Sequence, residues 1–261
     1  MTADQKTDSQ EDTALFEFCL RMGDNTLVLG HRISQWCGHA PVLEEDIALA
    51  NTALDLIGQT QMWLGLAGEV EGAGRDGDAL AFRRDAWDFR SCLLVEQPNG
   101  DFGQTLLRQY FFDAWQSVML PGLMGSSDER VAAIAAKASK EAAYHLERSR
   151  ETVIGLGDGT EESHMRMQAA LDLLYPYVGE MFGADRIDDE MHKRAIAPLP
   201  ADLRAAYDAE ITQVLNEATL TIPDDRWSHL GGRDGTKHSE HLGHILTQMQ
   251  WLQRAYPDAR W

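Results

Sequence analysis

The sequence has little of several features on which common protein classes depend. It holds only three cysteines, Cys19, Cys37 and Cys92, far apart and without a Cys-x-x-Cys pair. Neither a disulfide framework nor a thiolate zinc site is therefore expected. No window approaches the about 18 apolar residues that a membrane span needs, and residues 1–12 lack the basic and apolar blocks of a signal peptide. These absences predict a cytoplasmic protein.

Positive charge is scarce as well. Lys and Arg number 23 against 42 Asp and Glu, which gives a formal net charge of -19 over 261 residues. Such a chain repels polyanions, so nucleic acids and anionic membrane surfaces are excluded as main partners. The hydrophobic content of 44% supports a sizeable core in a chain of this length. The partners to expect are proteins or small molecules.

No convincing run of alternating β-branched residues appears, whereas apolar residues recur at helical spacing along most of the chain. Glycine and proline interrupt this pattern and predict four long helices, at residues 15–36, 43–67, 102–120 and 126–154. Shorter helical segments are predicted at residues 79–94, 164–182, 200–218 and 239–255. The pattern predicts an all-α fold, a four-helix bundle with additional C-terminal helices. Residues 1–12 are expected to form a disordered tail and residues 13–261 a single domain.

Acidic residues stand on otherwise apolar faces of the four long predicted helices. Burial of a carboxylate costs free energy unless the group is paired, protonated or bound to a cation. Di-iron carboxylate bundles use one acid from each of two helices and a Glu-x-x-His pair from each of the other two. The sequence matches that order. Asp24 and Asp113 stand at the places of the lone acids, and Asp55 and Glu141 stand at the first residues of the two Glu-x-x-His pairs, which we call the pair positions.

The two pair positions nevertheless lack their nitrogen ligands. Gly58 stands where the first histidine is needed, and Tyr144 stands where the second is needed. His145 follows one residue later, which rotates it by about 100° around the helix. We therefore expect no catalytic, cofactor-binding or metal-ligating residue in this chain. The degenerate ligand positions are Asp24, Asp55, Gly58, Asp113, Glu141, Tyr144 and His145.

Three interpretations of these positions stay open. The acids can be buried polar residues satisfied by hydrogen bonds and by bases such as Lys137 or Arg148. They can form a degenerate site that still binds a metal, or an intact oxidase site. The register of the first and third long helices is open too, since Glu17 or Gln109 can take the inward place.

Two further patterns are interpreted as structural. His238, His241 and His244 recur every three residues, as at a surface metal site, but no fourth ligand or His-Glu-x-x-His order accompanies them. The glycine-rich residues 231–235 follow no predicted strand and lack the Walker lysine, which indicates a loop. No Gly-x-Ser-x-Gly elbow occurs, so hydrolase chemistry has no support.

Several segments carry a resemblance to a known family over residues 14–261. They include Leu20-Arg21-Met22-Gly23-Asp24-Asn25, Trp36-Cys37-Gly38-His39-Ala40-Pro41, Asp55-Leu56-Ile57-Gly58-Gln59, Leu94-Val95-Glu96-Gln97-Pro98-Asn99-Gly100, Tyr144-His145-Leu146 and Glu240-His241-Leu242-Gly243. With these the chain resembles the structural subunits of bacterial phenylacetyl-CoA 1,2-epoxidases. The resemblance implies a ferritin-like subunit that has lost its di-iron ligands and pairs with a homologous catalytic subunit that keeps them. Gln35 departs from the family pattern, in which a relative has an acid.

The resemblance also implies the rest of the complex. A small accessory subunit and a reductase join the pair, and the assembly uses oxygen and NADPH to epoxidise the aromatic ring of phenylacetyl-CoA in aerobic phenylacetate degradation. This chain then holds no cofactor. The di-iron centre belongs to the partner subunit, whereas NADPH, flavin and an iron–sulfur cluster belong to the reductase.

Two rival functions make different predictions. A self-sufficient di-metal oxygenase or ferroxidase would bind iron and turn over oxygen without a partner. Its ligands would be Asp24, Asp55, Asp113, Glu141 and His145. An acyl-CoA binding module would need a basic pocket for its anionic ligand. The one dense cluster of bases in the sequence is Lys137, Lys140, Arg148 and Arg150.

Overall fold

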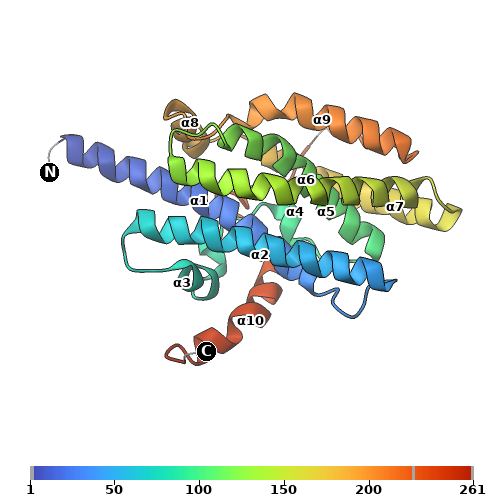
Figure 1. Cartoon of the computed structure of the whole chain (residues 1–261), viewed down its shortest axis with the longest axis horizontal. Helices are drawn as coiled ribbons and strands as arrows, with labels where there is room; N and C mark the ends of the chain where they lie inside the picture. Colours follow the sequence, from blue (N-terminus) through green and yellow to red (C-terminus); the bar gives the residue numbers. More distant parts are fainter. Residues whose placement is uncertain (1–2, 225–226, 260–261) are drawn as a thin grey trace. The chain divides into compact units, whose positions relative to one another are not determined.

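The computed structural model describes residues 3–224 and 227–259, and their side chains from residue 12 onward. Over these ranges the chain is helical, with the helices α1 to α10 and no strand, as Figure 1 shows. The predicted all-α class is confirmed. None of the helices in the described part is long and apolar enough to cross a membrane.

The chain divides into two compact units. The first comprises residues 1–97 and 231–261, and the second comprises residues 98–230. Each unit is built around one pair of long helices that follow each other in the sequence (Figure 1). The single domain expected over residues 13–261 stays a prediction.

The long pair of the first unit consists of α1 (Ala3–Ser34) and α2 (Leu43–Glu71). α1 takes in residues 3–12, where the sequence predicts a disordered tail. Glycines let the two helices approach, because a Cβ added at Gly23 would lie 2.6 Å from Leu64 Cδ2. The hydroxyl oxygens of Thr26 and Thr60 lie 2.8 Å apart between the helices. Small and hydroxyl side chains thus fix the packing of this pair.

Short elements complete the first unit. The segment predicted as one helix at residues 79–94 forms three pieces, α3 (Gly77–Phe82), η1 (Ala86–Asp88) and α4 (Leu93–Glu96). α10 (Glu240–Ala255) covers the first of them, since Gln250 donates to the carbonyls of Ala81 and Arg84 at 3.0 Å each. The loop at residues 231–235 contacts the segment too, because a Cβ at Gly232 would lie 2.3 Å from the Ser91 carbonyl oxygen.

The second unit pairs α5 (Phe102–Leu123) with α6 (Glu129–Gly157). Around this pair lie α7 (Glu161–Leu174), the short turns η2 (Tyr175–Tyr177) and η3 (Gly179–Phe182), α8 (Arg186–Lys193) and α9 (Pro200–Glu217). α5 continues past Pro121, although the sequence predicts an end there. Proline removes one backbone donor, and so close to the helix end its cost is small. α8 was not predicted, because eight residues hold too few turns for a clear apolar period.

Candidate functional site

Asp24, the first of the predicted positions, lies on α1 between the buried residues Leu20 and Leu27 and is itself fully buried. Both of its carboxylate oxygens accept hydrogen bonds from the Arg84 guanidinium, and the distance from Arg84 Nη1 to Asp24 Oδ2 is 3.0 Å. The backbone N–H of Arg90 donates to Oδ2 at 2.8 Å. The carboxylate therefore has a partner of opposite charge and a third donor besides.

Arg84 is equally enclosed. Its Nε donates to the carbonyl of Leu80, and its Nη1 donates to the carbonyl of Asp88 at 2.9 Å. The guanidinium carbon lies 4.3 Å above the centre of the Phe89 ring, a position in which the ring face attracts a cation. The turn that carries Arg84 thus supplies an acceptor and a ring face that hold the guanidinium toward α1.

Glu17 lies two helical turns before Asp24 and was the other candidate for the inward place on this helix. Its Oε2 accepts a hydrogen bond from Arg90 Nε at 2.7 Å. The side chains of this second pair are 22% and 19% exposed, against 0% and 2% for Asp24 and Arg84. Asp24 takes the inward place, and Glu17 lies nearer the surface, each with an arginine from the turn at residues 84–90.

The pair position on α2 lies closer to solvent. Asp55 and Gly58 are half-buried, and a Cβ added at Gly58 would meet nothing within 4 Å. The buried side of the same helix carries Leu56, Gln59 and Trp63 instead. A di-iron bundle needs an imidazole at the place of Gly58, and no side chain stands there.

Asp113 on α5 is the fully buried acid of the second unit. Gln109 Nε2 donates to its Oδ1 at 2.7 Å, and Ser149 Oγ of α6 donates to its Oδ2 at 2.8 Å. Burial raises the pKa of the Asp113 carboxyl to about 6, although His145, Ser149 and Gln109 all favour its charged form. Both candidates for the inward place on this helix, Asp113 and Gln109, are therefore buried and bonded to each other.

The pair position on α6 separates into an inner and an outer residue. Tyr144 is 57% exposed, whereas His145 is 2% exposed and acts on the charge of Asp113. Glu141 is half-buried. The one-residue step from 144 to 145 thus brings the imidazole, and not the phenol, to the acid of the neighbouring helix. Among the described residues, no three His, Cys, Asp or Glu side chains gather closely enough to share a metal ion.

Two of the three histidines before and within α10, His238 and His244, differ in their surroundings. His238 precedes the helix, and its Nδ1 lies 2.6 Å from Oε1 of the buried Glu96. The backbone N–H of Ser239 donates to the other Glu96 oxygen at 2.7 Å. His244 is exposed. The run thus begins with a buried histidine–carboxylate contact, and its interpretation as structural stays a prediction.

The basic cluster on α6 does not converge on one pocket. Lys137 and Lys140 are exposed. Arg150 binds Glu210 of α9 through two hydrogen bonds, of 2.9 Å from Nε and 2.6 Å from Nη2. The guanidinium is thus already paired, which leaves the lysines as solvent-exposed charges.

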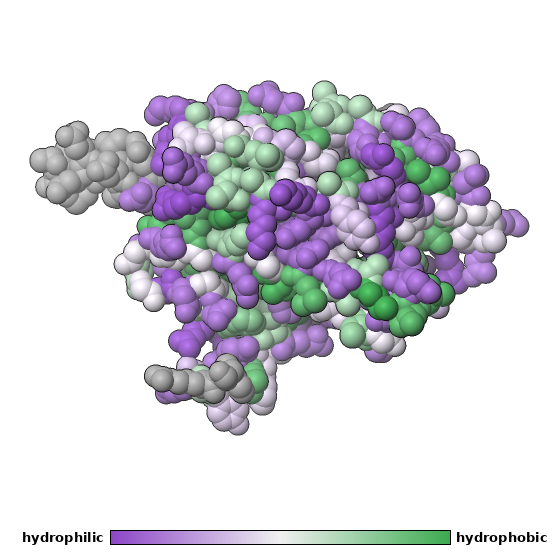
Figure 2. All heavy atoms as spheres, in the orientation of Figure 1, coloured by the Kyte–Doolittle hydropathy of each residue, from purple (hydrophilic) through white to green (hydrophobic). Residues whose placement is uncertain are grey.

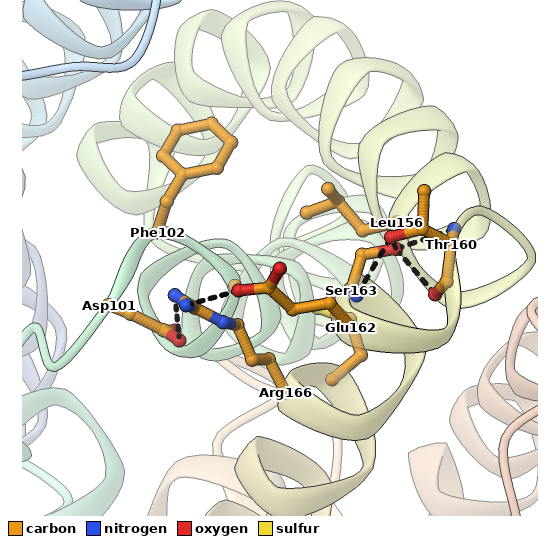
Figure 3. Close-up of a pocket in the computed structure, with 9 residues that line it drawn as sticks. Asp101, Phe102, Leu156, Thr160, Glu162, Ser163 and Arg166 are labelled. Carbon is orange, nitrogen blue, oxygen red and sulfur yellow. Dashed lines mark hydrogen bonds and ion pairs between the residues drawn. The ribbon is translucent and has the colours of Figure 1, made fainter.

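A separate cavity of about 270 Å³ opens in the second unit, where α5 and α7 begin. Figure 3 shows Phe102 and Leu156 lining it, with Arg166 beside Asp101 and Glu162. The Arg166 guanidinium lies 2.6 Å from the Glu162 carboxylate and 3.6 Å from that of Asp101. This volume lies slightly below the roughly 300 to 1,000 Å³ of small-molecule sites, and the one guanidinium at its edge is already paired with carboxylates.

Comparison with known proteins gives these residues a context. The model of the phenylacetic acid catabolic protein family matches residues 1–261. The chain belongs to this family. It is 49% identical to one of the subunits of the 1,2-phenylacetyl-CoA epoxidase of Escherichia coli (strain K12) over 247 residues, which cover 95% of this chain and 99% of the relative. The predicted resemblance to an epoxidase subunit and the ferritin-like helical class are confirmed.

Sequence reasoning missed the residues that satisfy the buried acids of the first unit. Arg84 and Arg90 lie 60 and 66 positions from Asp24, and Glu96 lies 142 positions from His238. One local signal existed, since Leu80 and Arg84 share a face at helical spacing. That spacing marks Arg84 as facing the core side but does not identify its partner.

Proposed function

We propose that this chain is a non-catalytic structural subunit of a phenylacetyl-CoA 1,2-epoxidase, which pairs with and supports a homologous subunit that carries the di-iron centre. The observation that carries the proposal is the state of the two histidine positions. Gly58 has no side chain, and the Tyr144 phenol is 57% exposed. A di-iron bundle takes an imidazole at both places, so this chain's residues do not fit that group. Its own contribution is packing.

The remaining components follow from the same proposal. A small accessory subunit and a reductase with NADPH, flavin and an iron–sulfur cluster would complete the complex. The similar protein of Escherichia coli is named as a subunit of an epoxidase, which supports an assembly of several chains.

A surface suited to a partner helix lies on α2. Leu43 at its start is 71% exposed, and Ile47 and Leu54 are 52% and 69% exposed. Figure 2 shows hydrophobic surface where Figure 1 places the first half of this helix. Between residues 45 and 68 the exposed side chains are Ile47, Asn51, Leu54 and Gln61, and all are uncharged. We call these four residues with Leu43 the α2 face.

The α2 face differs from the solvent side of α6, where Lys137, Lys140, Glu147 and Glu151 are exposed. Soluble surfaces usually mix charges in this second way, and an uncharged face with three large exposed apolar side chains indicates a protein contact. A second copy of this chain is a poor occupant, since each copy carries a net charge of -19. We assign this face to the homologous subunit of the proposed pair, through an obligate interface of about 2,000 Å² or more.

The first test is metal analysis of the purified chain, alone and co-expressed with an iron-binding homologue of the same family. We expect no stoichiometric iron in the isolated chain and iron in a complex that co-purifies. About two irons per isolated chain, as a di-iron bundle requires, would support the self-sufficient oxygenase instead.

The second test uses the α2 face. The double variant Ile47→Glu/Leu54→Glu should reduce co-purification with the homologous subunit by at least about tenfold, because it places two charges in an apolar contact. The matched control is Met165→Glu/Leu173→Glu on α7, whose side chains are 58% and 48% exposed. Both variants should keep the helical circular dichroism of the unmodified chain. An equal loss of co-purification in both variants, or no loss in either, contradicts the assignment of this face.

A further inference from the structure

A second cavity, of about 350 Å³, opens in the first unit, and residues of α1, α2 and α3 line it. Its volume lies within the range of roughly 300 to 1,000 Å³ of small-molecule sites. The wall joins apolar side chains with an imidazole and two carboxylates. We propose that this cavity binds a small organic cation with an apolar body, of the arylalkylamine class. The inference goes beyond the proposed function, since it concerns the chain by itself and needs no partner subunit.

The apolar part of the wall comes from all three helices. Leu27 of α1, Ile57 of α2 and Phe82 of α3 line the cavity. Glycines bring the helices close together, because a Cβ at Gly30 would lie 3.1 Å from Ile57 Cδ1 and a Cβ at Gly77 would lie 3.3 Å from a backbone nitrogen of α2. The packing of the helices thus forms the wall without a ligand, and a preformed site lowers the entropic cost of binding.

His31, near the end of α1, supplies the cavity with a hydrogen-bond acceptor. Its Nδ1 lies 2.9 Å from the Leu27 carbonyl oxygen, so the neutral ring carries its proton on Nδ1 and keeps a free electron pair on Nε2. Burial lowers the pKa of His31 below the ordinary value of 6.5, and the ring is therefore neutral at pH 7. Among the described residues no donor bonds to Nε2. An O–H or N–H group of a ligand can donate to this atom.

Two carboxylates give the cavity its preference for positive charge. Asp76 directly precedes α3, and its Oδ1 accepts a hydrogen bond from the Ala79 backbone N–H at 2.8 Å. Asp78 lies in the first turn of α3. Both line the cavity and are exposed, and no lysine or arginine is among the described residues of the wall. Because His31 is neutral, the wall carries two negative charges, which attract a cation and repel an anion.

The three parts of the wall define one class of ligand. A metal ion does not fit, since within the described part of the chain no three His, Cys, Asp or Glu side chains come together. An ammonium group suits Asp76 and Asp78, and an apolar body suits Ile57 and Phe82. A hydroxyl group can donate to His31 Nε2. Tyramine, a phenol with an aminoethyl chain, has all three features and is therefore the probe.

Titration of the full-length chain with tyramine, followed by NMR, tests the inference. We expect saturable binding with a Kd of about 1 mM or tighter, as a ligand of about ten non-hydrogen atoms allows. The ring signals of His31 should shift in the same titration. The phenol in which a carboxylate replaces the amine should bind at least about tenfold more weakly, because Asp76 and Asp78 repel it. No saturable tyramine binding up to about 10 mM, or equal binding of the anion, overturns the inference.

A charge variant locates the ammonium group. Asp76→Asn/Asp78→Asn should weaken tyramine binding by roughly three- to tenfold, the effect of losing two exposed charge contacts. Asparagine caps a helix as well as aspartate does, so the start of α3 should be kept. The control Glu129→Gln/Glu161→Gln removes two exposed charges from the first turns of α6 and α7 and should leave binding unchanged. An equal loss in both double variants would mean attraction by the net charge of the chain alone, and overturns the site.

A pair of ligands tests the place of the hydroxyl group. His31→Phe should weaken tyramine binding by roughly three- to tenfold and leave the binding of phenethylamine, which lacks the hydroxyl, nearly unchanged. His31→Gln keeps a hydrogen-bond acceptor, should retain more of the difference between the two amines, and gives a readout if the phenylalanine variant does not fold. If His31→Phe weakens both amines alike, or neither, the imidazole does not face the ligand, and the inference is overturned.

Discussion

Asp24 in the first unit and Asp113 in the second are both completely buried, yet their surroundings differ in charge. Asp24 is bound by the Arg84 guanidinium, whereas the hydrogen-bond donors to Asp113 are the neutral side chains of Gln109 and Ser149. Burial raises the pKa of Asp113 to about 6. The two acids thus differ in the charge of their donors, and a neutral donor compensates the charge of a buried carboxylate less than a guanidinium does.

This comparison gives opposite expectations for the two units. Removal of the partner of Asp24 should leave a charge without compensation, at a large cost. Removal of the charge of Asp113 should increase the unfolding free energy at neutral pH, because the folded chain then no longer buries a charged carboxylate without a cation bonded to it. The variants below test this contrast from the largest expected effect to the smallest.

Arg84→Met should produce the largest loss, about 3 to 5 kcal/mol of unfolding free energy at pH 7, because one partner of a buried ion pair stays uncompensated. The double variant Asp24→Leu/Arg84→Met replaces the whole pair by apolar groups and should recover most of that loss. Urea denaturation followed by circular dichroism measures both. A loss below about 1 kcal/mol in Arg84→Met, the range of an exposed pair, would show that the two buried acids do not differ as described.

Asp113→Asn should make the chain more stable relative to the unmodified protein as pH rises. The folded pKa of about 6 lies above the ordinary aspartate value of 3.8, so the folded state binds more protons between these two values. The contribution of Asp113 to the unfolding free energy therefore falls as pH rises through this window, by up to about 3 kcal/mol in total, and is constant above it. Asparagine cannot ionise and lacks this loss.

The measurement is the difference in unfolding free energy between Asp113→Asn and the unmodified chain at pH 4 and at pH 7.5. Relative to the unmodified chain, the unfolding free energy of Asp113→Asn should be higher at pH 7.5 than at pH 4. A difference that is the same at both pH values would mean that Asp113 does not titrate between them, and its burial would then carry no pH-dependent cost.

Ser149→Ala should cost about 1 to 2 kcal/mol at pH 7.5, since one oxygen of the Asp113 carboxylate loses its only hydroxyl donor. The cost should be smaller at pH 4, where the carboxyl is protonated and needs the donor less. Because the lost bond favours the charged form, the pKa of Asp113 should rise further in this variant. Ser117→Ala, whose hydroxyl donates to the Ala114 carbonyl within α5, is a control without this pH dependence.

The sequence predicted what depends on local periodicity. The apolar period placed α2, α5, α6, α9 and α10 close to their observed bounds and predicted the end of α1 but not its start at Ala3. The stripe of Leu20, Asp24 and Leu27 correctly put a carboxylate into the core. The rotation between adjacent positions also predicted that Tyr144 and His145 have different surroundings. All of these follow from neighbours within two helical turns.

The partners of the buried acids could not be predicted in this way. Arg84 approaches Asp24 only because the chain folds back through α2 and α3. Its spacing from Leu80 turns it toward the core but does not identify its partner, whereas the neighbouring Arg83 donates to the Pro257 carbonyl. The short α8 was missed because its eight residues give too little periodicity. Long-range pairing and short elements depend on the whole fold, which a periodic pattern does not encode.

Arg90→Gln should have the smallest effect and so mark the lower end of the comparison. It removes the partner of Glu17, in a pair whose side chains are 19% and 22% exposed, and partly exposed pairs contribute about 1 kcal/mol or less. The backbone N–H of Arg90, which donates to Asp24, is kept in this variant. Salt screens exposed charges more than buried ones, so 0.5 M sodium chloride should reduce the effect of Arg90→Gln and leave that of Arg84→Met nearly unchanged. If salt reduces both effects alike, the Asp24–Arg84 pair is open to solvent, and the distinction between a buried counter-ion and a surface ion pair fails.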